Sequence, residues 1–177
     1  MLDKIENFYE KITKYLGIVL VIVMILMALN VFYDVVMRYV FSQSSIAMQE
    51  MEWHLFSVLI LFGVSYALME EAHVRVDILY ERWTPKRKAM INMMGAIIFI
   101  LPLSLLVATN SVEFVAEAFR LNEISGDPGG LTHRWIIKAL IPLSFWVLIF
   151  FTFGYFIRNL NIYKKETLKE IETGVSL

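Results

Sequence analysis

The stretch that decides the fold is YLGIVLVIVMILMALNVFY, residues Tyr15–Tyr33, which contains no Asp, Glu, Lys or Arg. Three later runs also lack these four residue types: Trp53–Met69, Ala89–Val112 and Ala139–Ile157. A helix crosses the hydrocarbon core of a bilayer with roughly 20 apolar residues, whereas a helix on a soluble domain needs a polar face. The runs are also too long and continuous for the alternating strands of a β-barrel. The sequence therefore predicts an all-α membrane protein with four transmembrane helices.

The rest of the chain fits a single integral membrane domain over residues 1–177. Of its residues, 58% are hydrophobic and 19% are charged, and the segments between the runs are short. We place the spans at approximately 15–36, 50–70, 87–112 and 135–158. The acidic residues before the first run, Asp3, Glu6 and Glu10, are untypical of a signal peptide, so we expect a retained anchor.

The distribution of positive charge predicts the orientation. Twelve of the sixteen Lys and Arg residues lie in the N-terminal flank, the second connection and the C-terminal tail. Cytoplasmic segments carry such an excess. With four spans, this places both termini in the cytoplasm.

Short amphipathic segments flank the runs. Ile5, Phe8, Tyr9 and Ile12 have helical spacing, which predicts a short interfacial helix on the inner surface. The segment Glu113–Leu121 is also amphipathic, and we expect it to continue the third helix beyond the membrane or to lie along it.

Two prolines fall in or beside the spans. Pro102 lies inside the third span and Pro142 lies near the start of the fourth. Each removes a helical hydrogen bond, so both are expected to bend their helices.

Few features of the sequence indicate a catalytic, metal-binding or ion-transport site. The absence of Cys excludes disulfides, thiolate metal sites and a cysteine nucleophile. The charge-free runs argue against a self-sufficient ion carrier, because ion pathways normally use ionisable groups at membrane depth. Asn92, Ser104 and Ser144 are candidates for hydrogen bonds between helices. We predict that the chain is not an enzyme.

Two alternatives rest on histidine. His54 and His133 fall at the same predicted membrane edge, so a bis-His haem in a redox anchor subunit is one alternative. Glu50 and Glu52 with His54 suggest a metal site, although side chains two residues apart on a helix do not converge. A small independent carrier is a further alternative.

A polar face marks the end of the first run. Asn30, Asp34 and Arg38 recur every four residues, which places them on one face of a helix. They indicate either a helix end with an Asp34–Arg38 ion pair or a polar edge facing another membrane protein.

Several stretches in order resemble a known family. Arg38–Phe41, Ser45–Ile46, Gln49–Glu50 and Glu71–Asp77 are similar to the small membrane subunits of TRAP (tripartite ATP-independent periplasmic) transporters, the DctQ-like family. The resemblance is clearest over Asn30–Trp83 and continues in the four-span layout.

Two further stretches, Gln49–Phe56 and Ser125–Leu131, look like the mannitol/chloroaromatic branch of that family. The chain departs from the Trp-x-Glu-Glu pattern of many members, because Ala47-Met48-Gln49-Glu50 keeps only the last acid.

The resemblance implies a role in a complex. It implies a scaffold in the bacterial cytoplasmic (inner) membrane for a large, DctM-like membrane subunit that carries the substrate and sodium sites. A periplasmic substrate-binding protein would deliver an organic acid anion. It implies sodium symport with no cofactor in this chain, contacts with membrane lipids, and no nucleic acid partner.

Six residues are the candidate site residues. We hypothesise that Arg38, Glu50, His73 and Asp77 fix loop geometry or contact the large subunit. Asp127 and Arg134 are expected on the periplasmic face. No catalytic, substrate-binding or metal-binding residue is predicted.

Overall fold

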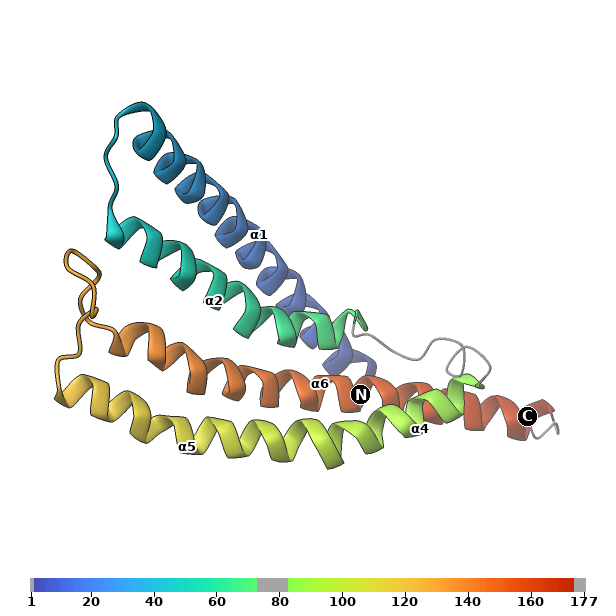
Figure 1. The fold of residues 1–177 in the computed structure, drawn as a ribbon. Coiled ribbons are helices and arrows are strands. Elements are labelled where there is room, and N and C mark those ends of the chain that lie inside the picture. Colours follow the sequence, from blue (N-terminus) through green and yellow to red (C-terminus); the bar gives the residue numbers. More distant parts are fainter. Residues whose placement is uncertain (1, 73–82, 174–177) are drawn as a thin grey trace.

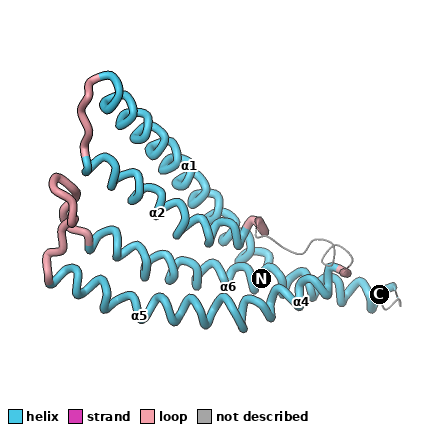
Figure 2. Tube along the Cα trace, viewed as in Figure 1, coloured by secondary structure: helices cyan, strands magenta, loops and turns pink. Residues whose placement is uncertain are grey.

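The computed structural model describes residues 2–72 and 83–173, and within these ranges the regular structure is entirely helical. The elements are α1 (Leu2–Val40), α2 (Ile46–Met69), α4 (Pro85–Gly95), a π-helix η1 (Ala96–Ile100), α5 (Leu101–Arg120) and α6 (Trp135–Thr173) (Figure 2). Since α4, η1 and α5 follow one another without a break, the described residues form four helices long and apolar enough to cross a membrane. The prediction of an all-α, four-helix membrane protein is confirmed.

Helix α6 organises the bundle. It packs against α5 and α4 on one side and against α2 and α1 on the other, while α1 runs along α2. Figure 1 shows the connection from α1 to α2 and that from α5 to α6 at one end of the bundle, with the N and C ends toward the other. We call these the loop end and the terminal end. The cytoplasmic placement of the termini stays a prediction.

The core lies in the half of the bundle nearer the terminal end. It joins one residue of α1, two at the end of α2, one of η1 and three of α6, namely Tyr9, Leu68, Met69, Ala96, Leu148, Phe151 and Tyr155. Tyr9 reaches α6 because Gly154 has no side chain, and its ring centroid lies 4.8 Å from that of Phe150. A glycine here allows two helix backbones to approach closely, as small residues do in membrane bundles.

Helix α1 buries only a narrow seam. Nine of its partly or fully buried positions recur at alternating steps of four and three residues, at Tyr9, Thr13, Leu16, Leu20, Val23, Met27, Asn30, Asp34 and Met37. This is the spacing of a coiled-coil seam. Much of the rest of the helix is exposed, with Phe32 at 68% and Tyr15 at 70%.

Local sequence sets where two helices begin. The Ser45 side chain accepts a hydrogen bond from the backbone N–H of Met48 at 3.4 Å and starts α2. The Thr84 side chain accepts from the N–H of Arg87 at 3.4 Å and starts α4, with Pro85 as its first residue. Such caps satisfy amide groups that have no partner within the helix.

The two prolines are accommodated differently. The π-helix η1 ends two residues before Pro102, and the N–H of the intervening Leu101 donates to the carbonyl of Ala96, five residues back. The combined α4–η1–α5 helix follows a curved path (Figure 1), in keeping with the bend expected at a proline and a π-turn. Pro142 lies inside α6, and the nearby Ser144 hydroxyl donates to the carbonyl of Ile141 at 2.8 Å.

The interfacial segments differ in part from expectation. The predicted separate N-terminal helix is wrong, because residues from Leu2 onward form the first turns of α1. One ion pair and two hydrogen bonds to α6 hold these turns in line with the span. The segment from Glu113 does continue the third helix, as far as Arg120. Helix α6 extends to Thr173, well beyond the predicted end of the fourth span.

The three polar candidates for interhelical bonds behave in three ways. The Asn92 amide donates to the Asn159 side-chain oxygen at 2.9 Å, joining α4 to α6, so this prediction is confirmed. Ser144 bonds within its own helix instead. The Ser104 hydroxyl is buried and has no hydrogen-bond partner among the described residues.

Candidate functional site

Three of the six predicted site residues meet in a polar pocket at the loop end. The pocket has a volume of about 430 Å³ and lies between the start of α2, the 121–134 connection and the start of α6. We call it the loop-end pocket. Its lining residues are Ile46, Gln49, Glu50, Trp53, His54, Ser57, Asp127, Arg134 and Ile137.

Glu50 holds the 121–134 connection against α2. One carboxylate oxygen accepts a hydrogen bond from the Ser125 hydroxyl, and the other accepts from the backbone N–H of Leu131 at 2.5 Å. The connection also closes on itself, because the N–H of Ser125 donates to the carbonyl of Leu131 at 3.0 Å. A carboxylate with two donors is well suited to fixing a turn.

Gly130 makes this arrangement possible. A Cβ at this position would lie 2.5 Å from the Ser125 side chain and 2.8 Å from Oε2 of Glu50. Any larger residue would therefore force the Ser125 side chain, the Glu50 carboxylate or both to shift. The neighbouring Gly129 has φ +84°, which side chains rarely adopt.

Asp127 and Arg134 contribute opposite charges to the pocket. The backbone N–H of Asp127 donates to the Ser125 hydroxyl at 3.2 Å, and its carbonyl accepts from Gly130 at 3.0 Å. Arg134 is 42% exposed, and its Nε lies 3.9 Å from Glu123. Since Glu123 also pairs with Lys138, Arg134 is held only loosely.

Arg38 lies apart from the pocket lining. It forms an ion pair with Asp34 one turn earlier on α1, as one of the two interpretations of this face predicted. The Asp34 side chain is 4% exposed and that of Arg38 is 46% exposed. One turn further back, the Asn30 amide donates to the carbonyl of Met48 at 2.9 Å and joins α1 to the start of α2.

His73 and Asp77, the two remaining predicted site residues, lie outside the described residues. His54 lines the loop-end pocket, and the Nδ1 of His133 lies 2.8 Å from the Thr132 hydroxyl. Within residues 2–72 and 83–173, no group of three or more His, Asp or Glu side chains is placed to hold a metal ion.

Sequence reasoning missed the polar contacts of α6 at the terminal end. The Arg158 guanidinium donates to the carbonyl of Met69 at 2.8 Å, at the last residue of α2, and lies 3.6 Å from Glu71. A cation is favourable at the C-terminus of a helix. The signal was visible in hindsight, because Arg158 directly follows a charge-free run.

A second set of missed contacts, which we call the terminal clamp, ties the start of α1 to α6. Lys165 and Asn161 both donate to Asp3 at 2.9 Å, and Asn161 also donates to Glu6 at 2.7 Å. The hydrogen bond from Lys165, followed by that from Asn161, lowers the pKa of Asp3 to about 2. The same contact with Asp3 raises the pKa of Lys165.

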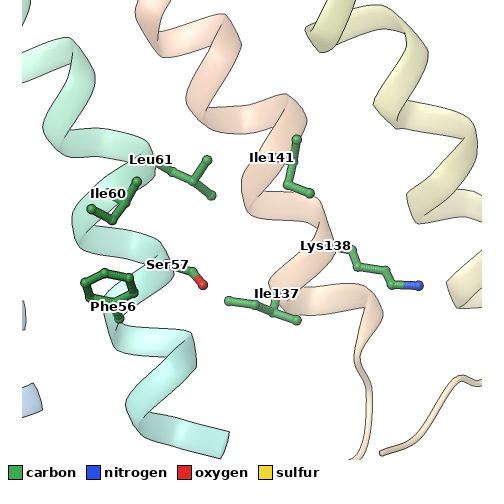
Figure 3. Close-up of a pocket in the computed structure, with 7 residues that line it drawn as sticks. All are labelled: Phe56, Ser57, Ile60, Leu61, Ile137, Lys138 and Ile141. Atoms are coloured by element: carbon green, nitrogen blue, oxygen red, sulfur yellow. The ribbon is translucent and has the colours of Figure 1, made fainter.

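An apolar groove adjoins the loop-end pocket. It has a volume of about 350 Å³ and separates α2 from α6, and it shares Ser57 and Ile137 with the pocket. In Figure 3 these two side chains point toward one another across the gap, whereas Lys138 points away from α2 toward the neighbouring helix. The amine of Lys138 lies 4.0 Å from the ring centroid of Phe114 on α5.

Comparison with known proteins assigns the chain to a family. Residues 27–161 match the family model described as the DctQ component of tripartite ATP-independent periplasmic transporters. A candidate TRAP transporter small permease protein of Haemophilus influenzae is 29% identical over 133 residues, which covers 75% of this chain and 83% of that protein. The family is a transporter component rather than an enzyme. The chain therefore belongs to the DctQ family of TRAP transporter small subunits, and it is a multi-pass membrane protein.

Proposed function

We propose that this chain is the small transmembrane subunit of a sodium-coupled TRAP transporter and scaffolds the large permease subunit. In this role it supports the binding-protein-dependent uptake of an organic acid anion, in a bacterial inner membrane. The chain itself carries neither the substrate nor the sodium ion. Membership of the DctQ family supports the general role.

The observation that carries the scaffold role is the lack of acidic and basic side chains in the four apolar runs. None of the four runs contains Asp, Glu, Lys or Arg. Several hydroxyl groups in the runs form hydrogen bonds within their own helices: Thr152 donates to Leu148 at 2.7 Å and Thr109 to Leu105 at 2.8 Å. Because ion pathways normally need ionisable groups at membrane depth, a static role suits this chain better than transport.

The proposal also assigns sides and contacts. With the terminal end in the cytoplasm, the loop-end pocket faces the periplasm, and Asp127 and Arg134 lie on that face. Arg38, Glu50, His73 and Asp77 are proposed to fix loop geometry or to contact the large subunit.

Reconstitution tests the role directly. Proteoliposomes would contain the large subunit with or without this chain, and uptake of radiolabelled C4-dicarboxylates and sugar acids would be measured with the purified binding protein. We expect uptake only with an inward sodium gradient and only when this chain is present. Equal uptake without the chain, together with failure of the two subunits to co-purify, would refute the proposal.

The interface hypothesis has a separate test. The double variant Arg38→Ala with Asp77→Ala is expected to recover less large subunit when this chain is tagged and co-purified. Arg120→Ala is the matched control for the Arg38 change, because its side chain is 69% exposed and also lies at the loop end of the bundle. Unchanged recovery of the large subunit with the double variant would refute the hypothesis for these residues.

A further inference from the structure

The loop-end pocket and the apolar groove form one amphiphilic cleft. They share Ser57 and Ile137 as lining residues, so a ligand in the polar part lies directly beside the apolar part. The walls of the apolar part come from Phe56, Ile60 and Leu61 on α2 and from Ile141 on α6 (Figure 3). A cleft with one polar and one apolar end fits a ligand with the same division.

The polar end offers one positive and one negative group. Glu50 is occupied by Ser125 and Leu131. Lys138 is directed away, toward Glu123 and Phe114 on the far side of α6. The charged side chains left at the pocket are those of Asp127 and Arg134. The Nε of Arg134 lies 3.9 Å from the carboxylate of Glu123.

The groove is too small to enclose a whole helical turn. One turn of an α-helix, about 10 Å wide and 5.4 Å long, fills roughly 420 Å³. The apolar groove holds about 350 Å³ and is open along its side. It therefore has less room than a single helical turn requires, whereas an acyl chain is thin enough to enter.

We propose that this cleft binds one phospholipid with a zwitterionic, amine-bearing headgroup of the phosphatidylethanolamine type. The phosphate lies against the Arg134 guanidinium, the ammonium lies near the Asp127 carboxylate, and an acyl chain follows the groove between α2 and α6. Arginine is well matched to phosphate. Asp127 disfavours a lipid whose headgroup carries only negative charge, such as phosphatidylglycerol. The proposal does not depend on the transport role.

Native mass spectrometry of the delipidated full-length protein in detergent tests the proposal. Phosphatidylethanolamine and phosphatidylglycerol with identical acyl chains would be titrated separately. We expect one tightly bound phosphatidylethanolamine and weaker binding of phosphatidylglycerol. Arg134→Gln should weaken the first by about fivefold, and Asp127→Asn should reduce the preference between the two lipids.

Two further variants distinguish lipid binding in the groove from non-specific lipid binding to the apolar surface. Ile60→Trp should fill the groove and remove the bound lipid, and because Ile60 is 54% exposed the change leaves the core intact. Leu106→Trp, at a position 60% exposed on α5, is the matched control and should bind as before. Arg120→Gln is the control for charge at the loop end.

Three results would overturn the proposal. The first is equal binding of both lipids, and the second is equal loss of lipid in Ile60→Trp and Leu106→Trp. The third is loss of the bound lipid when the protein is purified with its large subunit, which would show that a partner protein covers the cleft.

Discussion

Replacing Gly154 with Ala should separate the start of α1 from α6. The new Cβ would lie 2.6 Å from Cγ of Tyr9, whereas carbon atoms pack at about 3.5–4.0 Å. Because Cγ is the root of the tyrosine ring, rotating the ring cannot relieve the overlap, and the helices must move apart by about 1 Å. Such overpacking costs about 1–3 kcal/mol, against a gain of about 1 kcal/mol from replacing a helical glycine.

The control is Gly63→Ala, at a helical glycine where a Cβ meets nothing within 4 Å. This variant gains the higher helix propensity of alanine without a steric clash. The free energies of unfolding of the two variants should therefore differ by the full 1–3 kcal/mol estimated above. In thermal unfolding in detergent, each kcal/mol shifts the midpoint by about 2–4 °C for a chain of this size. Gly154→Ala should therefore melt at least about 2 °C below Gly63→Ala. When both glycine variants are made in a Tyr9→Ala background, most of the difference between them should disappear.

The result that would refute this reasoning is a Gly154→Ala variant as stable as Gly63→Ala. That outcome would mean that the Tyr9 ring does not occupy the space above Gly154 in the protein. If Gly154→Ala still melts below Gly63→Ala when both carry Tyr9→Ala, the new methyl group must clash with a residue other than Tyr9.

Two further predictions concern the ends of the bundle. At the loop end, Glu50→Gln should speed hydrogen exchange of the Leu131 amide, because the substitution removes the charge from its acceptor; Glu52→Gln should leave it unchanged, and equal effects would contradict the role of Glu50. At the terminal end, the lowered pKa of Asp3 means that its contact with Lys165 stabilises the clamp above pH 4 and is lost as the pH falls toward about 2. The raised pKa of Lys165 keeps the other partner charged into the alkaline range. Spin labels placed near the start of α1 and near the end of α6 should report one constant distance from pH 5 to pH 9. Asp3→Asn should broaden the distribution of that distance at every pH in this range. A change in the distance between pH 5 and pH 9 in the unsubstituted protein would rule out this contact as the clamp.

The number and kind of helices were predictable because four uncharged runs leave the chain few alternatives. The helix faces that pack against other helices were not predictable from hydrophobicity, because a run that is apolar on all sides has no hydrophobic periodicity. On α1 only the rare polar residues marked the seam: Thr13, Asn30 and Asp34 all fall on it. The helical continuation of α6 to Thr173 was missed because it depends on partners from α1 and α4 that are distant in sequence.

The sequence identified candidate site residues, but it did not predict that they lie together. Glu50 was proposed as an interface or loop-fixing residue, and Asp127 and Arg134 as residues of the periplasmic face; the fold brings all three to one pocket. Their meeting depends on Gly130, which lets the turn close on the Glu50 carboxylate. A local pattern cannot reveal this, because the hydrogen bonds join residues about 80 positions apart.

The length of α6 has a mechanical consequence. Its 39 residues form a rod of about 58 Å, nearly twice the thickness of the hydrocarbon core. The loop-end pocket is attached near one tip and the terminal clamp near the other. If the rod moves as a unit, a tilt of about 10° displaces one tip by roughly 10 Å relative to the other. A force applied to either surface of the membrane would then be felt at the opposite one.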